Sequence, residues 1–260
     1  MELLKKLRAM TQAPLTECKN ALEEAGGDLD QAQQILRDRG ALKASKKADR
    51  ETNEWVVVMQ NINNMTVGIK FACETDFVAK NETFRGLAQT IVGYIAEEGK
   101  EITSVDELSD TTKERVDALI KDNFVTIGEN MQLLDAFSKE WQSYIYAHPG
   151  DKIAVAVFYQ GEEEAAKDAA LQIAAMNPWF HKISDVPSEQ VEEEKARFME
   201  ELAEDSKPED IKAKIVEGKL AKFYSEIVFE EQSSIKDDSK KMKEYLAGRC
   251  DVDTYIRYAI

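Results

Sequence analysis

The feature that most constrains the fold is a pair of strands followed by a helix, a pattern that the chain contains twice. In the first copy, "WVVVMQNINNMTVGIKFAC" (55–73), two β-rich runs flank the turn-forming residues "NINN". Alternate residues of the second run share one face of a strand, and these are Val67, Ile69, Phe71 and Cys73. Apolar residues then recur at helical spacing, namely Phe84, Leu87, Ala88, Ile91, Val92 and Ile95. The pattern predicts a strand–strand–helix unit.

The second copy begins with "SYIYAHPGDKIAVAVFYQ" (143–160), a hairpin with its turn at "HPGD". Its alternating residues are Ile153, Val155, Val157 and Tyr159. In "EEEAAKDAALQIAAM" (162–176), small and apolar residues repeat the spacing found between Phe84 and Val92, and they are Ala166, Ala169, Ala170, Ile173 and Ala174. The two copies predict an α+β fold whose core is a pseudo-repeat. The segment "CDVDTYIRYAI" is expected to add a closing strand.

The segments outside these units have helical patterns. Residues 2 to about 40 predict three short helices, separated in part by the helix stop "GGD" at 26–28. Their expected apolar faces carry Leu3, Leu4, Leu7 and Met10, then Cys18, Ala21 and Leu22, then Ala32, Ile35 and Leu36. The polar stretch after them is interpreted as a partly helical linker.

Residues 187–226 predict two antiparallel helices joined near "DSKPED". The first should turn Val191, Phe198, Met199 and Leu202 toward Ile211, Ile215 and Phe223 of the second. This helical hairpin either projects as a coiled coil or packs on the core, and the pattern favours neither.

We therefore expect four parts. The three-helix module and its linker span 1–50, and the N-terminal half of the core spans 51–140. The C-terminal half is formed by 141–186 and 227–260, with the helical hairpin inserted at 187–226.

The excess of acidic over basic residues limits the kinds of partner that the protein can bind. With 50 acidic and 34 basic residues, the net charge is −16, which disfavours direct binding to a phosphate backbone. The most basic segment, "LKASKKADR" (42–50), is interpreted as a solvated linker. No apolar run approaches the roughly 20 residues of a membrane span, and the start lacks the apolar region of a signal peptide. We expect a cytoplasmic protein without membrane contact.

Motifs for catalysis and for cofactor binding are missing from the sequence. Three widely spaced cysteines, Cys18, Cys73 and Cys250, fit reduced thiols, and neither His148 nor His181 has a metal-ligand spacing. No phosphate-binding glycine loop or nucleophile elbow occurs. We expect a protein that is not an enzyme and that carries no cofactor or metal; an acid–base enzyme using scattered carboxylates ranks last among the alternatives.

The two units differ at one point, the connection from strand to helix. Tyr159 and Ala166 are seven positions apart, whereas Cys73 and Phe84 are eleven apart. The four additional residues fall at "TDFV" (75–78), and the second unit closes without them. Either they serve a function besides chain closure, or they form a helix start in which Asp76 is the N-cap and Phe77 or Val78 a hydrophobic staple. The residues of this turn alone favour the helix start.

The segment "TDFVAKN" (75–81) resembles a motif of bacterial elongation factor Ts. Further segments resembling the same family occur in the expected order, and they are "LRAMTQAPLTECKNALEEAGGDLDQAQQILRDRG" (7–40), "IGEN" (127–130), "AAMNP" (174–178) and "KIVEGKLAKF" (214–223). The resemblance covers nearly the whole chain, and it reverses the preference at "TDFV" in favour of a functional role.

The resemblance implies a guanine-nucleotide exchange factor whose partner is elongation factor Tu. It implies that a UBA-like N-terminal module and the core dock on the GTPase domain, with further contacts from the helical hairpin. Asp76 would perturb the region of the partner's magnesium, and Phe77 would wedge between partner helices near the nucleotide. The implied partner-binding residues are Thr75, Asp76, Phe77, Val78, Ala79, Lys80, Asn81, Ile127 and Gly128.

A different class of function stays open on the residues. Where the family commonly has "TGAGMMDCK", this chain has "TQAPLTECK", and "MQLLDAF" follows Asn130 where a pair of arginines is common. These differences motivate the alternative of a protein-binding scaffold that has the same fold but no exchange activity.

Overall fold

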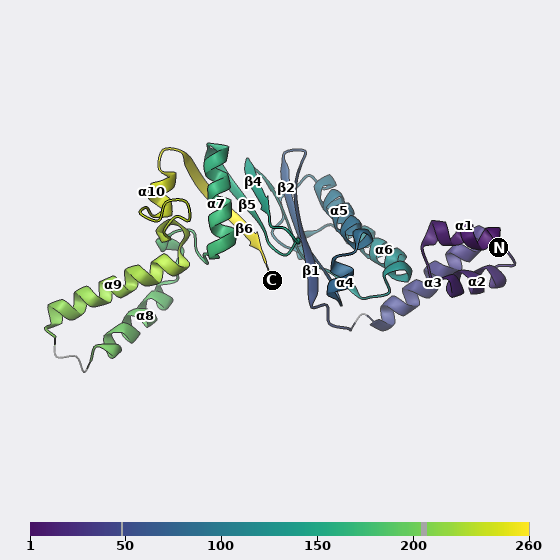
Figure 1. Ribbon diagram of the computed structural model, residues 1–260, viewed down its shortest axis with the longest axis horizontal. Coiled ribbons are helices and arrows are strands. Elements are labelled where there is room, and N and C mark those ends of the chain that lie inside the picture. Colours follow the sequence, from purple (N-terminus) through teal and green to yellow (C-terminus); the bar gives the residue numbers. More distant parts are fainter. Residues whose placement is uncertain (48, 204–206, 260) are drawn as a thin grey trace. The chain divides into compact units, whose positions relative to one another are not determined.

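The computed structural model describes residues 1–47, 49–203 and 207–259 (Figure 1). It divides into two compact units. The N-terminal unit comprises Met1–Trp141, Ala147–Ala154 and Tyr258–Ile260, and the C-terminal unit comprises Gln142–Tyr146 and Val155–Arg257. Each unit contains one three-stranded sheet and helices, so the prediction of an α+β fold is confirmed.

The sheet of the N-terminal unit is antiparallel and has the order β1-β2-β3. Strands β1 (Glu54–Ile62) and β2 (Met65–Cys73) form the predicted hairpin, and β3 (Met131–Glu140) pairs with the other side of β2. Ile62 is paired with Met65, so the turn consists of Asn63 and Asn64 alone. Both have positive φ, 49° and 66°, a conformation that asparagine adopts more readily than most residues and that suits two-residue hairpins.

Helix α5 (Glu82–Glu97) packs on β1 and β2. Its buried face contains all six residues that the helical spacing predicts, and Phe84 stacks on Phe71 with ring centroids 4.6 Å apart. The four predicted core residues of β2 are buried, but Thr66, Gly68 and Ala72 on its other face are buried too. Strand β2 is the central strand, and the Phe137 ring of β3 packs against Gly68. A strand covered on both faces does not show the alternation of a half-exposed one.

Three helices precede the sheet, as predicted: α1 (Glu2–Thr11), α2 (Leu15–Glu24) and α3 (Leu29–Lys47). Their core consists of Leu7, Ala13, Cys18, Ala21, Ala32 and Leu36. Leu3 and Met10, which the periodicity placed on the buried face of α1, are instead about half exposed, at 47% and 48%. A bundle of three short helices covers only a narrow stripe on each, and these two side chains fall outside it.

Helix α3 continues to Lys47, beyond the expected end near residue 40, because the sequence there is rich in good helix formers and contains no proline. It packs against α6 (Asp110–Ile127), and Val125 of α6 contacts both Gly40 and the three-helix core. The Thr126 hydroxyl donates a hydrogen bond of 2.9 Å to the Thr11 carbonyl oxygen. The three helices are therefore in contact with the rest of the N-terminal unit.

The C-terminal unit has the strand order β4-β5-β6, with β4 (Ser143–Ala147), β5 (Ala154–Gly161) and the predicted closing strand β6 (Cys250–Tyr258). Helix α7 (Glu163–Met176) packs its alanine-rich face on β5, beside the sheet in Figure 1. The predicted alternation began at Ile153, one residue before the start of β5. Ile153 lies before the strand and is half buried, and its carbonyl accepts a hydrogen bond from the His148 amide that closes the loop.

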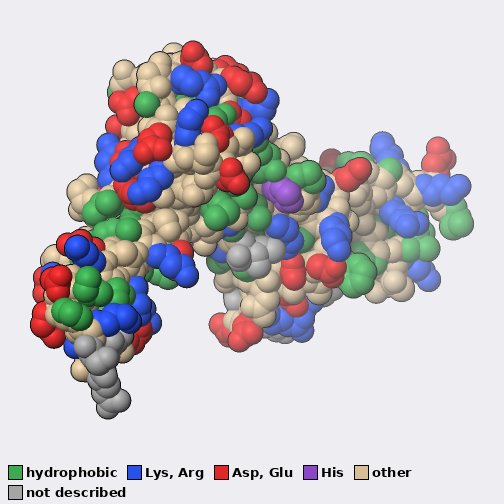
Figure 2. Space-filling model, turned by 60° about the vertical axis from the view of Figure 1, so that its left-hand side comes forward, with side chains coloured by type: hydrophobic (Ala, Val, Ile, Leu, Met, Phe, Trp, Pro, Cys, Tyr) green, Lys and Arg blue, Asp and Glu red, His purple; other side chains and the backbone are tan. Residues whose placement is uncertain are grey.

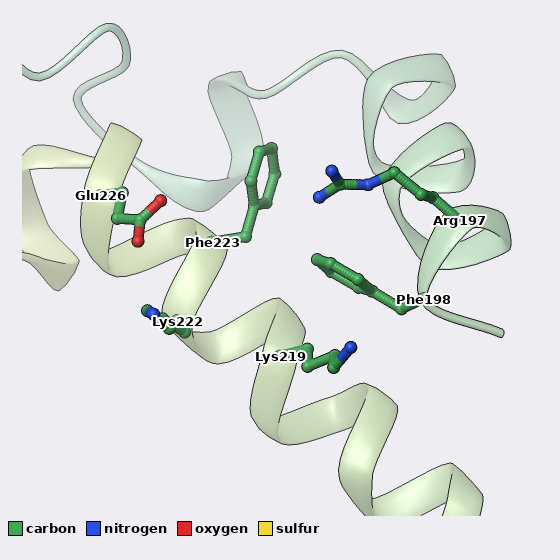
Figure 3. A pocket seen from close by; sticks show the side chains of 6 residues that line it. All are labelled: Arg197, Phe198, Lys219, Lys222, Phe223 and Glu226. Atoms are coloured by element: carbon green, nitrogen blue, oxygen red, sulfur yellow. The ribbon is translucent and has the colours of Figure 1, made fainter. Parts of the chain in front are cut away.

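The helical hairpin consists of α8 (Ser188–Glu201) and α9 (Glu209–Ile227), which pack against each other. Phe198 of α8 and Phe223 of α9 point into the space between the two helices (Figure 3). Met199 and Ile211, both predicted on the contact face, are exposed at 53% and 38%, and Val216 is buried instead. Two helices present narrow contact stripes to each other, so residues at the margins of an apolar face stay in solvent.

A cavity of about 230 Å³ opens beside Phe198, and Arg197 and Lys219 extend over it (Figure 3). Both cations are already paired within the hairpin. Arg197 lies 2.5 Å from Glu194, and Lys219 contacts Glu201. The two cations beside the Phe198 ring are therefore neutralised by acidic residues of the hairpin itself.

We expect Gly161→Ala to destabilise the protein by about 2–3 kcal/mol. Gly161 has φ of +116°, and a Cβ there would overlap the Arg249 carbonyl oxygen, which accepts a 2.8 Å hydrogen bond from the Glu162 amide. The matched control is Gly248→Ala, since Gly248 also has positive φ but no atom within 4 Å of a Cβ. Gly248→Ala should lower the free energy of unfolding by only about 1 kcal/mol. Equal midpoints of urea unfolding for the two variants would contradict the predicted overlap.

Candidate functional site

Three of the four additional residues, Asp76, Phe77 and Val78, lie with Ala79 in a one-turn helix, α4 (Asp76–Ala79). Thr75 is its N-cap, and the Thr75 hydroxyl accepts a hydrogen bond of 3.4 Å from the Val78 amide. Ala79 is buried and Val78 packs partly against the core of the unit. The turn thus has one side attached to the core, and its other side is free to present residues to solvent.

Phe77 lies on that free side with 81% of its surface exposed. Phe77 therefore does not act as a hydrophobic staple, and Asp76 is not the N-cap, because Thr75 is. Val78, the other residue considered for the staple, does pack partly against the core. Asp76 lies in the first turn of α4, 2.7 Å from the Lys80 ammonium group. That hydrogen bond holds the pKa of Asp76 below its ordinary value, so Asp76 carries a negative charge at neutral pH.

The C-terminal end of α4 is also anchored. Asn81 is the N-cap of α5, and its side-chain oxygen accepts a 2.8 Å hydrogen bond from the Thr83 amide. Arg85, one turn into α5, donates to the Ala79 carbonyl at 3.3 Å and pairs with Asp151 at 3.0 Å. The Asp76–Phe77 turn is therefore held against α5 at the end where it joins that helix.

Ile127 and Gly128 end helix α6. Gly128 is the C-cap, with φ of 79°, and its amide donates to the Phe124 carbonyl at 2.7 Å. The carbonyl of Gly128 accepts a 2.6 Å hydrogen bond from the ammonium group of Lys47, at the end of α3. Ile127, the residue before the capping glycine, packs partly against the core of the unit, and this contact helps to hold the end of α6 in place.

The structure brings the loop after α6 (128–130) against the start of α4. Glu129 accepts hydrogen bonds from the Thr75 amide at 3.0 Å and from the Thr75 hydroxyl at 2.7 Å. In the reverse direction, Glu74 accepts a 2.7 Å hydrogen bond from the Asn130 amide. Arg50 pairs with Glu74 at 3.1 Å, and the Arg50 carbonyl accepts from the Asn130 side chain at 2.8 Å. We call Glu74, Thr75, Glu129 and Asn130 the reciprocal clasp.

Sequence reasoning placed Thr75 in the site but assigned no role to Glu74, Glu129 or Asn130. The available signal was a glutamate directly before the first motif, in "CETD", and one inside the second, in "IGEN". Nothing in a single sequence indicates that residues 54 and 56 positions apart are paired. The structure therefore joins the two predicted parts of the site through residues that the prediction did not include.

Burial of Glu74 by itself would raise the pKa of its carboxyl group, but hydrogen bonds from Asn130 and Arg50 outweigh burial, and the pKa lies below its ordinary value. Glu74 is thus an anion in the clasp at neutral pH. The neighbouring Cys73 is fully buried, and burial and then Glu129 raise the pKa of its thiol to about 12. Cys73 stays protonated and donates to the Thr75 carbonyl at 3.3 Å, as an inert structural thiol.

Across the residues that the structure describes, no group of three or more His, Cys, Asp or Glu side chains is arranged to hold a metal ion. The geometry at α4 offers an exposed aromatic ring, a carboxylate and a rigid backbone. Such a surface supports recognition of another molecule.

A further finding concerns membranes. No helix in the described ranges has both the length and the apolar character needed to cross a bilayer.

Comparison with known proteins agrees with the resemblance seen in the sequence. Residues 74–260 match the family model described as "Elongation factor TS". The chain is 40% identical over 266 residues to elongation factor Ts of Hydrogenobaculum sp. (strain Y04AAS1), covering 100% of this chain and 97% of the relative. It is 42% identical over 265 residues to that of Aquifex aeolicus (strain VF5), covering 95% and 91%. The corresponding protein of Cupriavidus metallidurans is 36% identical, covering 95% and 85%.

These matches extend over both units, and they define the class as a translation elongation factor, active in protein biosynthesis. Within that class, the chain belongs to the elongation factor Ts family.

Proposed function

We propose that this protein promotes release of GDP from elongation factor Tu so that GTP can bind. In this proposal, Asp76 and Phe77 insert near the partner's magnesium and nucleotide site. The observation that carries it is the exposure of Phe77, 81% of whose surface faces solvent on a turn anchored at both ends. An exposed aromatic side chain on a rigid turn is suited to a partner's pocket, because little conformational entropy is lost when it docks.

Exchange of this kind needs no covalent chemistry, so we propose that the protein is not an enzyme in the bond-making sense. If the factor and GDP weaken each other's binding to the GTPase, linkage makes the antagonism reciprocal. Burial of one phenylalanine contributes roughly 1.5–3 kcal/mol, and each ~1.4 kcal/mol of antagonism changes an affinity tenfold. The Asp76 carboxylate adds a negative charge, and the bound metal is often the largest local charge at a phosphate site.

The surface supports a protein partner. Acidic and basic side chains are interspersed on the face of the molecule seen in Figure 2, and the chain as a whole carries a net charge of −16. We propose that the protein makes no direct nucleic-acid contact, because an acidic surface repels phosphates. Leu3 and Met10 of α1, exposed beside the three-helix core, are proposed to add affinity at a second contact. A role in translation is consistent with a cytoplasmic location.

The proposal is tested by following the release of fluorescently labelled GDP from the cognate GTPase, with and without this protein. We expect the release rate to rise with factor concentration and then to saturate. Binding of the GTPase without faster release would instead support the non-exchanging scaffold. Calorimetric titration of the factor alone with GDP, GTP and magnesium is the control, and it should show no stoichiometric binding.

A further inference from the structure

The position of Phe77 depends on more than the residues of α4. This helix has four residues, and a single turn is unstable in isolation because helix nucleation is unfavourable. The direction in which Phe77 points must therefore come from the groups that anchor the turn. At the N-terminal end, those groups belong to the reciprocal clasp.

We propose that Glu129 and Glu74 are positioning residues for exchange: through the reciprocal clasp they fix the N-terminal end of α4 and so orient Phe77 toward the partner. The inference rests on the proposed function, since it concerns how the Phe77 turn is held for that reaction. It assigns a role to two carboxylates that act through Thr75 and the loop after α6.

The first step is the bond pattern at Thr75. Its hydroxyl donates to Glu129 at 2.7 Å and accepts from the Val78 amide at 3.4 Å. Since a hydroxyl has one hydrogen, donation to Glu129 leaves its lone pairs available to the helix N-terminus. The second oxygen of Glu129 receives the Thr75 amide at 3.0 Å. Glu129 therefore fixes both the backbone and the side-chain rotamer of the N-cap.

The second step is that Glu129 is itself held. The loop that carries it is tied back by Glu74, which receives the Asn130 amide at 2.7 Å. Arg50 pairs with Glu74, and Lys47 donates to the Gly128 carbonyl at 2.6 Å, so each side of the clasp is held by one cation. Each loop thus supplies a carboxylate to the backbone of the other, which restricts relative movement more than a single bond does.

The chain contains a matched control in the same unit. Glu107 accepts from the Thr103 amide at 2.8 Å and from the Thr103 hydroxyl at 3.0 Å, the same pair of bonds that Glu129 makes with Thr75. Thr103 is not the N-cap of α4, the helix that carries Phe77. A substitution of Glu107 removes the same type of interaction without altering the N-cap of α4.

The test measures labelled GDP release at saturating factor. We expect Glu129→Ala to lower the maximal rate roughly fivefold to tenfold, with a smaller change in the half-saturating concentration. Glu107→Ala should leave both unchanged. Glu129→Gln, which keeps one acceptor oxygen, should fall between the original chain and Glu129→Ala, and it replaces Glu129→Ala if that variant fails to fold. A normal maximal rate for the Glu129 variants would overturn the inference.

A purely structural role is separated by a double-mutant cycle. If Glu129 acts through Phe77, Glu129→Ala should cause no further loss of rate in a Phe77→Ala background. Independent, additive losses would overturn the inference. As a readout that needs no partner, amide hydrogen exchange at Val78 and Ala79 should become faster in Glu129→Ala and stay unchanged in Glu107→Ala. Unchanged exchange at Val78 and Ala79 would also overturn it.

Failure of the inference and failure of the proposed function give different results. If the original chain accelerates GDP release and the Glu129 variants do so equally well at saturation, the positioning role is wrong and the exchange function stands. If the original chain accelerates no release, the proposed function is wrong, and the positioning role falls with it.

Discussion

Phe77→Ala is expected to lower the maximal rate of GDP release about thirtyfold while leaving the melting temperature of the free protein nearly unchanged. The thirtyfold figure corresponds to roughly 2 kcal/mol, the size of an interface hot spot, provided that the ring contacts the partner mainly in the nucleotide-releasing state. In the free protein 81% of the side chain is in solvent, so its removal should cost less than about 0.5 kcal/mol.

The measurement pairs stopped-flow GDP release at saturating factor with thermal unfolding of the isolated variant. Phe77→Leu serves as the conservative control, because it keeps an apolar side chain of similar reach and should retain part of the rate. A large drop in melting temperature together with normal release would show that Phe77 supports the fold rather than exchange. Asp76→Ala should slow release in the same direction, with non-additive effects if both residues perturb one element of the partner.

Phe84→Ala, the same substitution seven positions after Phe77, should affect the stability of the fold strongly. Phe84→Ala is expected to destabilise the N-terminal unit by about 3–5 kcal/mol, the usual cost of removing a buried phenylalanine. Phe84 has no exposed surface, and its ring stacks on that of Phe71, where the first turn of α5 packs on β2. The truncation removes the stacked partner and leaves a cavity that the rigid sheet cannot close.

Urea unfolding monitored by circular dichroism measures this effect, with Phe77→Ala as the control for a phenylalanine lost from the same turn region. Because the chain has two units, the unfolding curve is fitted with a separate transition for each. The transition of the N-terminal unit should shift and that of the C-terminal unit should not. A shift below about 1 kcal/mol would contradict the placement of Phe84 in the core.

The sequence by itself determined the local elements. The first hairpin with its turn inside "NINN", the apolar face of α5, the glycine stop between α2 and α3 and the closing strand β6 all depend on propensities and periodicities within a few residues. The comparison of the two units also located residues 75–78, which supply the N-cap and the first three residues of α4. These features are local, and a single chain is enough to reveal them.

Only the tertiary structure decided which apolar residues are covered. Leu3, Met10, Met199 and Ile211 have the right helical spacing but lie in solvent, because the width of a buried stripe is set by the neighbouring element. For the same reason, the exposure of Phe77 was not readable from the turn, where a staple and a free ring have the same local pattern.

The hydrogen bonds of the reciprocal clasp could not be predicted from sequence patterns. Glu129 and Thr75 are 54 positions apart, and Glu74 and Asn130 are 56 apart. They meet because β3 pairs with β2, which places the loop that enters β3 beside the turn that leaves β2. Periodicity reports the environment of one element at a time, whereas a hydrogen bond between two loops depends on how the sheet and helices pack together. The residues that orient Phe77 were therefore decided by strand pairing.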